Sequence, residues 1–383
     1  MPLQFIAIAN PENRRLGFLQ KALELFDIPP ATIVNYSDLI AGRDTLEKFD
    51  APDTIIRFDS PEKNFAVEKA IIAAGAQVQD EPDGGKHQRI GAAEALALEF
   101  DKGRILYPRQ WYLGWRDLLA RSQKQLRCRT MNDPADIAAM FDKPRCQQLF
   151  ANNGIPIPRS LGKIGSYEEL REAMNSRQCH RVFVKLAHGS SASGVVAYRV
   201  SPRGEVAVTT VERVRQENKT IFYNSRKIRT YTRREAVADI INMLCKEGVQ
   251  VEEWLPKARL QNRPFDLRVV AIAGQARHIV VRLGNSPMTN LHLGSDRGDL
   301  EEFLAQVGGQ NWDKMKQTCE AAAALFPNSL YCGIDLLVYP DFRQHAILEI
   351  NAFGDLLPGI TWNGMDTYAS EVQAILSSLG CGV

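Results

Sequence analysis

Two apolar runs near the C-terminus decide the fold: Tyr331-Cys332-Gly333-Ile334-Asp335-Leu336-Leu337-Val338-Tyr339 and His345-Ala346-Ile347-Leu348-Glu349-Ile350-Asn351. Both runs read as strands, and the turn-rich segment 340–344 between them predicts a hairpin. With a five-residue loop Tyr339 faces His345, and counting back along the strands places Asp335 opposite Glu349. Directly opposed side chains lie about 5 Å apart at Cβ, so the two acids are expected to form a pair.

This acid pair predicts a metal site. Two partly buried carboxylates at that separation need a proton or a cation between them. Asn351 lies two residues beyond Glu349 on the same strand face and adds a carbonyl oxygen. Two carboxylates and an amide oxygen leave positions open for phosphate and water, which suits Mg²⁺. The predicted ligands are therefore Asp335, Glu349 and Asn351, and the alternative is a polar strand surface with an accidental acid pair.

A second segment indicates phosphate binding. The run 181–185 reads as a strand that ends on Lys185, a loop of small residues follows, and 195–200 reads as the next strand. Glycine and serine allow backbone N–H groups and hydroxyls to approach phosphate oxygens closely. No G-K-[ST] is present and a strand follows the loop, so this is not a Walker loop. An ordinary hairpin connection is the alternative. The loop residues concerned are Gly189, Ser190, Ser191, Ser193 and Gly194.

Strands and helices alternate over the first hundred residues. Apolar runs at 3–9, 32–36 and 54–58 read as strands, and helical spacing covers 14–26 and 62–74, the latter with Pro61 as its first-turn proline. This alternation predicts a small doubly wound sheet. No G-x-G-x-x-G follows the first strand, which argues against a dinucleotide. The Gly-rich stretch 81–86 reads as a surface loop, with a substrate contact as the alternative.

Aromatic and basic side chains crowd the segment 106–126, among them Tyr112 and Trp115. The segment predicts a connecting helix whose aromatics wedge two domains together, and stacking on a planar ligand is the alternative. Asp133 before Pro134 predicts the cap of the next helix.

A basic stretch at 203–234 predicts a solvated hairpin or a rim for an acidic substrate, since Glu212, Glu217 and Glu235 dilute its charge. Nucleic-acid binding is the more distant alternative.

Composition narrows the class of protein. The 383 residues exceed one simple core and suit two or three domains. Lys and Arg number 47 against 45 Asp and Glu, a balance that argues against a dedicated nucleic-acid or membrane-surface protein. No apolar run reaches bilayer length, and Lys21 and Glu24 interrupt the segment that could pose as a signal peptide. The seven scattered cysteines contain no C-x-x-C and read as thiols of a reducing compartment, so a cytoplasmic protein is expected.

An ordered set of motifs resembles the ATP-grasp superfamily. Within that superfamily, the chain is most similar to the carboxylate–amine ligases related to ribosomal-protein glutamate ligases and glutathione synthetases, and the match runs from about residue 141 to residue 359. Asp355 and Leu356 depart from the small residues typical after the position of Asn351. The motifs, in order, are Asp142-Lys143, Lys185 with its loop, Val251-Glu252-Glu253-Trp254-Leu255, Asp266-Leu267-Arg268, Arg282, Thr289-Asn290-Leu291-His292, Gly333-Ile334-Asp335 and Glu349-Ile350-Asn351.

The resemblance implies roles for several of these residues. Lys143 and Lys185 are similar to the two lysines that contact the phosphates of ATP, with surface lysines as the alternative. Asn290 would place an amide near the triphosphate or the metal. The hinge strand that sandwiches adenine resembles Glu252, Glu253, Trp254 and Leu255, and an ordinary strand is the alternative there.

Arg268 and Arg282 are expected to be neighbours. They lie on the runs 267–273 and 278–283, which a tight Gly274-Gln275 turn joins. Paired arginines near a phosphate site can neutralise the charge that develops as a γ-phosphoryl group moves. The alternative is a surface ion-pair role with Asp266, Glu252 or Glu253.

The expected fold class is α/β and α+β. An N-terminal Rossmann-like, pre-ATP-grasp domain (1–110) and an aromatic and basic connector (111–140) precede the two ATP-grasp subdomains, 141–250 and 251–383, and the second carries the Mg²⁺ site.

The resemblance implies an ATP-dependent, amide-forming carboxylate–amine ligase that forms an acylphosphate and releases ADP and phosphate. Its cofactors would be ATP and Mg²⁺, with Mn²⁺ as a substitute. Its partners would be small-molecule or peptide carboxylates and amines, with no membrane, and a homo-oligomer stays open. The alternatives are a phosphotransferase on the same scaffold and a non-catalytic ATP-binding regulator.

Overall fold

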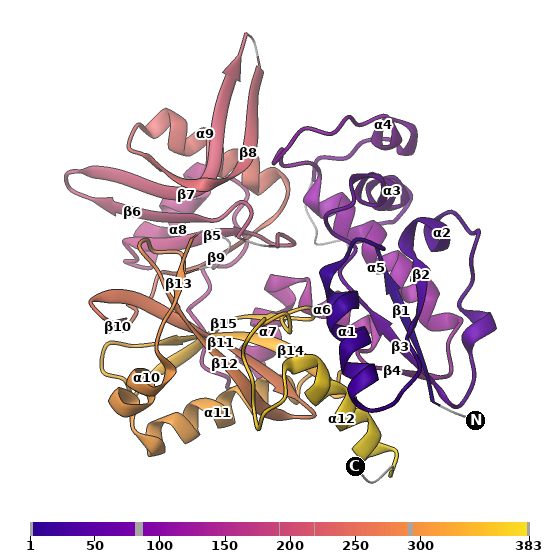
Figure 1. The fold of residues 1–383 in the computed structure, drawn as a ribbon. Helices are drawn as coiled ribbons and strands as arrows, with labels where there is room; N and C mark the ends of the chain where they lie inside the picture. The colour runs from indigo at the N-terminus through magenta and orange to yellow at the C-terminus, as the bar shows by residue number, and fades with distance from the viewer. Residues whose placement is uncertain (1–2, 81–86, 191, 218, 290–293, 381–383) are drawn as a thin grey trace.

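The computed structural model describes residues 3–80, 87–190, 192–217, 219–289 and 294–380, and within them the strands form three sheets (Figure 1). The predicted loop at 81–86 and the site residues Ser191 and Asn290 lie outside the described residues. In the part of the chain that the structure describes, no helix combines the length and the apolar character needed to cross a bilayer.

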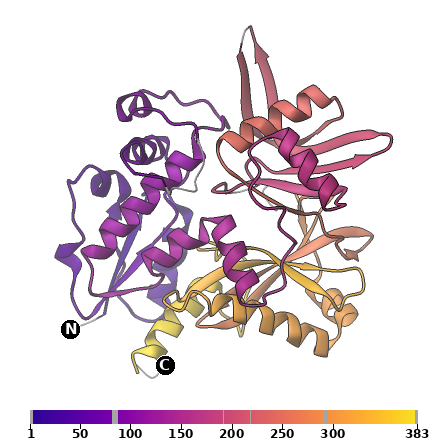
Figure 2. The same cartoon turned by 180° about the vertical axis from the view of Figure 1, so that it is seen from behind.

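The first sheet is parallel, with strand order β2-β1-β3-β4, so the predicted doubly wound sheet is confirmed. Seen from behind, α5 lies across this sheet (Figure 2). The elements of this part are β1 (Gln4–Ala9), α1 (Arg14–Leu25), β2 (Thr32–Asn35), α2 (Tyr36–Ile40), η1 (Glu47–Phe49), β3 (Thr54–Phe58), α3 (Phe65–Gly75), α4 (Ala92–Leu96), α5 (Pro108–Lys124), β4 (Arg129–Thr130), α6 (Pro134–Met140) and α7 (Lys143–Asn152).

The predicted helix start on Pro61 is wrong. Helix α3 begins at Phe65, and Asn64 is its cap, with a side-chain oxygen that accepts from the Val67 N–H. The backbone turns at Lys63, where φ is 73°, so the chain enters the helix only after that turn. The Pro61 carbonyl accepts instead from Asn10 Nδ2 at 2.7 Å, which ties the ends of β1 and β3 together. The predicted cap of α6 by Asp133 is confirmed.

The second sheet is antiparallel, with strand order β8-β7-β6-β5-β9. Its β7–β8 hairpin projects from the sheet (Figure 1), which confirms the hairpin predicted for the basic stretch. Backbone hydrogen bonds join it to the first part of the chain, since the Ile105 N–H donates to Phe222 O at 3.1 Å. The elements are α8 (Tyr167–Ser176), β5 (Arg181–Leu186), β6 (Val196–Ser201), β7 (Gly204–Gln216), β8 (Lys219–Tyr231), α9 (Arg234–Lys246) and β9 (Val249–Glu253).

The third sheet has the order β13-β12-β11-β14-β15, with β10 paired to β11. Helices α10 and α11 cover one side of it, and α12 packs against α1 and β11 (Figure 1). The elements are β10 (Arg259–Leu260), β11 (Arg263–Ile272), β12 (Gln275–Leu283), β13 (Asp296–Arg297), α10 (Leu300–Val307), α11 (Gly309–Ala323), β14 (Tyr331–Val338), β15 (His345–Asn351) and α12 (Thr367–Ser378).

The β14–β15 hairpin reaches the predicted acid pair by a different register. Val338, not Tyr339, faces His345, so the predicted five-residue loop is wrong. A bulge then shifts the register between Asp335 and Leu336, and this shift restores Asp335 opposite Glu349. The β11–β12 turn also differs by one residue: Ile272 pairs with Gln275, so Ala273 and Gly274, both at positive φ, form the turn.

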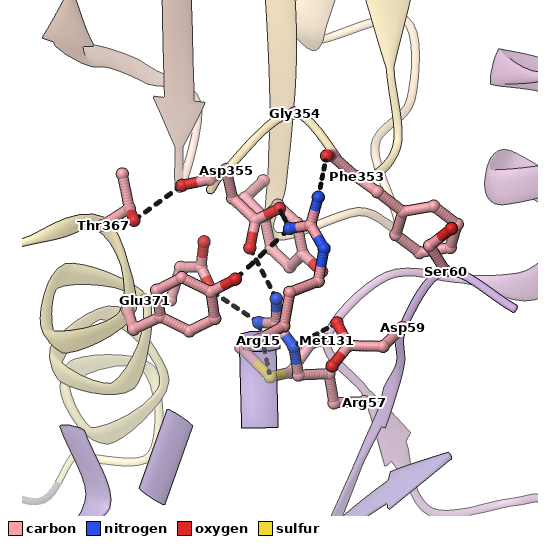
Figure 3. Close-up of polar contacts among 12 residues, drawn as sticks. Arg15, Arg57, Asp59, Ser60, Met131, Phe353, Gly354, Asp355, Thr367 and Glu371 are labelled. Atoms are coloured by element: carbon pink, nitrogen blue, oxygen red, sulfur yellow. Dashed lines mark hydrogen bonds and ion pairs between the residues drawn. The ribbon is translucent and has the colours of Figure 1, made fainter. Parts of the chain in front are cut away.

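A buried cluster of charges joins the first part of the chain to the segment after β15 (Figure 3). The fully buried guanidinium of Arg57 on β3 binds three carboxylates. Its nitrogens lie 3.0 Å from Asp59, 2.6 Å from Asp355 and 2.6 Å from Glu371 on α12. The rings of Tyr331 and Tyr368 lie against the same guanidinium, each with its centroid 4.8 Å away.

Helices α3 and α5 cross at two glycines, which yields the first prediction. A Cβ on Gly114 would lie 2.0 Å from Ile71 O, so Gly114→Ala forces the helices apart. We expect the free energy of unfolding to fall by about 2–3 kcal/mol, measured by denaturant titration. Gly17→Ala on α1 is the matched control, since its Cβ would meet nothing within 4 Å. It should stabilise the protein by about 0.5–1 kcal/mol, and equal effects of the two variants would contradict the close packing.

The charge cluster predicts a pH-dependent stability. Burial raises the pKa of Glu371 from 4.5 to about 8, against the opposing effect of Arg57. The folded state therefore holds a proton that the unfolded chain releases above its ordinary pKa, so stability falls as the pH rises through this window. We expect the wild-type Tm to drop between about pH 5 and about pH 8.5 by more than that of Glu371→Gln, which cannot titrate. Parallel Tm profiles would refute a protonated Glu371.

Candidate functional site

A cavity of about 500 Å³ lies where the three sheets meet. Its walls come from the carboxyl ends of β1 and β3, the loop after β5, the end of β9, and the facing strands β11, β12, β14 and β15. Most of the predicted site residues that the structure describes line this cavity: Lys143, Lys185, Gly189, Ser190, Ser193, Glu252, Glu253, Leu255, Arg268, Arg282, Asp335, Glu349 and Asn351.

Asp335 is an acid of the cavity that binds two arginines. Its Oδ1 lies 2.6 Å from Arg268 Nε, and its Oδ2 lies 3.1 Å from Arg282 Nη2. Burial opposes its charge, but the two guanidinium groups outweigh burial and lower the pKa of Asp335 to about 2. Arg268 and Arg282 are thus neighbours, as expected. Both side chains point toward Asp335 because its carboxylate binds both guanidinium groups.

Glu349 finds its cation on another element. Lys143 begins α7, and its Nζ lies 3.1 Å from Glu349 Oε1 while it also donates to the Gly189 carbonyl. Both acids of the predicted pair therefore have basic partners in the protein itself. Lys143 thereby joins the small-residue loop to the acid pair, which places the loop predicted to bind phosphate beside the predicted metal ligands.

The donor set fits a magnesium ion. Asn351 Nδ2 donates to Gly333 O at 3.3 Å, which leaves the side-chain carbonyl oxygen as the donor for a cation. Among the described residues no three His, Cys, Asp or Glu side chains cluster as a ready-made metal site. Mg²⁺ usually takes one or two carboxylates and completes its shell with phosphates and water, so two acids and one amide suffice.

Lys257 is a cavity residue that the sequence reasoning missed. It follows the hinge run directly, and its buried Nζ lies 2.8 Å from Asp266 Oδ2 and contacts Thr289 Oγ1. Burial lowers its pKa, although Asp266 opposes this shift. Asp266 also accepts from Arg282 Nε at 2.7 Å, so Lys257, Arg282 and Arg268 form a row of cations along one wall. Its position just after the hinge was the available signal.

The predicted hinge residues have different surroundings. Glu252 is buried and binds Lys185 Nζ, and its pKa is raised by burial. Glu253 pairs with Arg159 at 3.2 Å near the surface. Leu255 lines the cavity, whereas Trp254 packs on Phe183 with ring centroids 5.4 Å apart and is not a lining residue.

His188 fixes the loop after β5 to helix α5. Its ring stacks on Tyr112 with centroids 3.9 Å apart, and its Nε2 lies 3.0 Å from Arg109 Nη1 and 3.5 Å from Asp142 Oδ2. Burial lowers the pKa of His188 to about 4, so it is neutral near pH 7. The aromatics of α5 thus join parts of the chain, as expected of a connecting helix, and none of them lines the cavity. Gly194 lies close to Leu186, since an added Cβ would be 2.5 Å from Leu186 Cδ1, and Gly194 itself is not a lining residue.

The Lys185–Glu252 pair yields a prediction for stability. Lys185→Met leaves a buried carboxylate without its cation, which should lower the free energy of unfolding by about 3–5 kcal/mol in denaturant titrations. Adding Glu252→Gln should restore part of the loss. Arg159→Ala, which breaks the more exposed pair with Glu253, is the control and should cost less than about 1 kcal/mol. Equal losses for the two single variants would contradict the burial of Glu252.

Comparisons with known proteins show what the sequence and the fold are similar to. Residues 157–336 match a family model described as YheC/D-like ATP-grasp. No curated protein sequence matches the chain. Among solved structures it is similar to the D-cycloserine synthetase DcsG, at 13% identity and a TM-score of 0.57, covering 98% of this chain and 99% of that one.

Two further similar structures hold precursors. The ATP-grasp ligase PsnB complexed with a minimal precursor has 15% identity and a TM-score of 0.54, covering 98% of this chain and 99% of that one. The macrocyclase MdnC from Microcystis aeruginosa MRC, bound with the precursor peptide MdnA, has 14% identity and a TM-score of 0.52, covering 98% and 100%. Identities this low show that this chain shares the fold of these ligases, and the family match covers residues 157–336 of it.

Proposed function

We propose that this protein is an ATP-dependent ligase that activates a carboxylate as an acylphosphate and joins it to an amine, releasing ADP and phosphate. One observation carries the proposal: a single cavity brings a row of buried cations against two carboxylates and an amide on adjacent strands. Such an arrangement is suited to holding and neutralising a triphosphate.

The nucleotide would occupy the part of the cavity between the second and third sheets. Apolar side chains, among them Leu255, Leu337 and Leu348, line this part and could hold adenine. Lys143, Lys185 and the loop at 189–194 would hold the phosphates. Asp335, Glu349 and Asn351 would hold Mg²⁺, which would offset the charge of the phosphates.

The substrates would occupy the wall that the first sheet supplies. The strands β2 and β3 lie on opposite sides of β1, so the strand order reverses at β1. Ligands of open α/β sheets bind at the carboxyl ends of the strands at such a switch point. Arg14 and Lys63 line this end of the cavity beside Glu12 and Glu62. Cations and acids on one wall suit a substrate that carries both carboxylate and amino groups, as a free amino acid or a peptide does. The precursors in the PsnB and MdnC complexes are consistent with the peptide alternative.

The proposed chemistry balances without a protein nucleophile. A substrate carboxylate oxygen attacks the γ-phosphorus, and the bond from that phosphorus to the β–γ bridging oxygen breaks, which releases ADP. The amine then attacks the acyl carbon and loses a proton, and phosphate leaves with the bonding electrons. The chain's residues bind and orient the reactants, and Arg268 and Arg282 neutralise charge on the transferring group.

The test of this function is Mg-ATP turnover with pooled amino acids, peptides and small carboxylates. Hydroxylamine replaces the amine, and mass spectrometry identifies the products. A hydroxamate formed with ADP would establish an activated carboxylate and name the acid. ADP with a stable phosphorylated product and no hydroxamate would show a phosphotransferase instead.

The variant Glu349→Gln tests the role of the acid pair. It removes one carboxylate from the predicted metal ligands and one partner from Lys143, so ADP release should fall by at least about a hundredfold while the circular dichroism spectrum is retained. Glu168→Gln, which breaks an exposed pair with Arg234, is the control and should keep wild-type turnover. A fully active Glu349→Gln enzyme would refute the metal assignment.

A further inference from the structure

The charge cluster around Arg57 is connected to the cavity through the backbone segment that follows β15. Asp355 lies four residues beyond Asn351, and its Oδ2 binds Arg57 at 2.6 Å. Its Oδ1 binds Arg15 of α1, whose Nη2 also donates to the Phe353 carbonyl at 2.5 Å. Figure 3 shows both guanidinium groups converging on this segment from the first part of the chain. The segment 353–355 is therefore held by two arginines from outside the third sheet.

The same segment touches the phosphate side of the cavity. Gly354 packs on Gly333 of β14 so closely that a Cβ on Gly354 would lie 2.4 Å from the Gly333 Cα. The Gly354 carbonyl accepts from Arg268 Nη1 at 3.3 Å, and Arg268 Nε binds Asp335 at 2.6 Å. A continuous series of contacts thus runs from Arg57 through Asp355 and Gly354 to Arg268.

We propose that Arg15, Arg57 and Asp355 are positioning residues, which set the orientation of Arg268 toward the terminal phosphate by fixing the Gly354 carbonyl. The proposal rests on the proposed function, because it takes Arg268 as a ligand of that phosphate. A guanidinium held at two of its nitrogens, by Asp335 and by Gly354, keeps one orientation at the site where charge develops.

Stability alone is a weak reason for this cluster. Buried ion pairs are often matched or exceeded in stability by apolar residues of the same volume. Arg15 lines the cavity as well, so the cluster reaches from the interior to the substrate wall. These features are expected of a device that fixes geometry.

The experiment measures the affinity of two nucleotides by isothermal titration calorimetry, which needs no knowledge of the substrate. Mg-AMPPNP carries a terminal phosphate and Mg-ADP lacks it, so the ratio of their Kd values isolates contacts to that phosphate. Asp355→Asn keeps the shape of the side chain and removes its charge. We expect it to weaken Mg-AMPPNP about tenfold and Mg-ADP by less than about twofold. Arg268→Gln should show the same selective loss.

Two further variants separate positioning from simple destabilisation. Arg15→Lys keeps the charge but loses the fork that binds Asp355 and Phe353 together, so it should show the same selectivity in a milder form. Glu205→Gln disrupts another buried carboxylate, which binds Tyr167 at 2.6 Å and Arg171 at 3.1 Å in the second sheet, outside the cavity. It should lower Tm without changing the ratio of the two affinities.

A double-mutant cycle tests whether Asp355 acts through Arg268. If Asp355 acts through Arg268, Asp355→Asn should add little in the Arg268→Gln background. A full additional loss there, or an unchanged affinity ratio in a folded Asp355→Asn protein, would overturn the proposal and leave the ligase function intact. A folded wild-type protein that binds neither nucleotide would overturn both.

Discussion

The site depends on the ion pairs that the carboxylate of Asp335 forms with Arg268 and Arg282. Asp335 lies on the fully buried strand β14 and binds Arg268 of the adjacent strand β11 and Arg282 of β12, the next strand beyond. It also faces Glu349 across the hairpin. Burial alone would favour its protonated form, and the two guanidinium groups reverse that preference. An acid held ionised in this way orients both arginines in the absence of any ligand. Under the proposed function, phosphate charge would enter an arrangement that is already built, so little reorganisation would accompany binding.

The buried cations of the cavity are balanced by acids. Lys143 pairs with Glu349, Lys185 pairs with Glu252, and Lys257 shares Asp266 with Arg282. Phosphate oxygens can take over the partnership of a lysine, since an ammonium group forms bonds in several directions. The pairs thus avoid a buried excess of positive charge, and under the proposed function Glu349, once released from Lys143, would be available to a metal ion.

The three sheets meet through contacts that are far apart in sequence. His188 ties the loop after β5 to α5, and Arg57 ties β3 to the segment after β15. Both contacts are buried, so each is shielded from the solvent screening that weakens surface pairs. They hold the first sheet and the loop after β5 near the strands of the third sheet, and residues of all three parts line the cavity.

The local sequence was enough to predict the parallel sheet and the pairing of the two acids on adjacent strands. The alternation of the first hundred residues predicted the parallel sheet, and the position of Asp335 opposite Glu349 followed from strand period. That pairing emerged although the loop was counted one residue short, because a bulge at the acid pair compensated for the longer loop. The start of α3 was misplaced because a positive φ at Lys63, which the proline rule does not consider, delays the helix. Lys257, His188 and the Arg57 cluster could not be predicted in this way. A buried charge is tolerated only where its partners converge, and Arg15 and its partner Asp355 lie 340 positions apart in the sequence. The fold therefore selects which of the many charged side chains belong to the site.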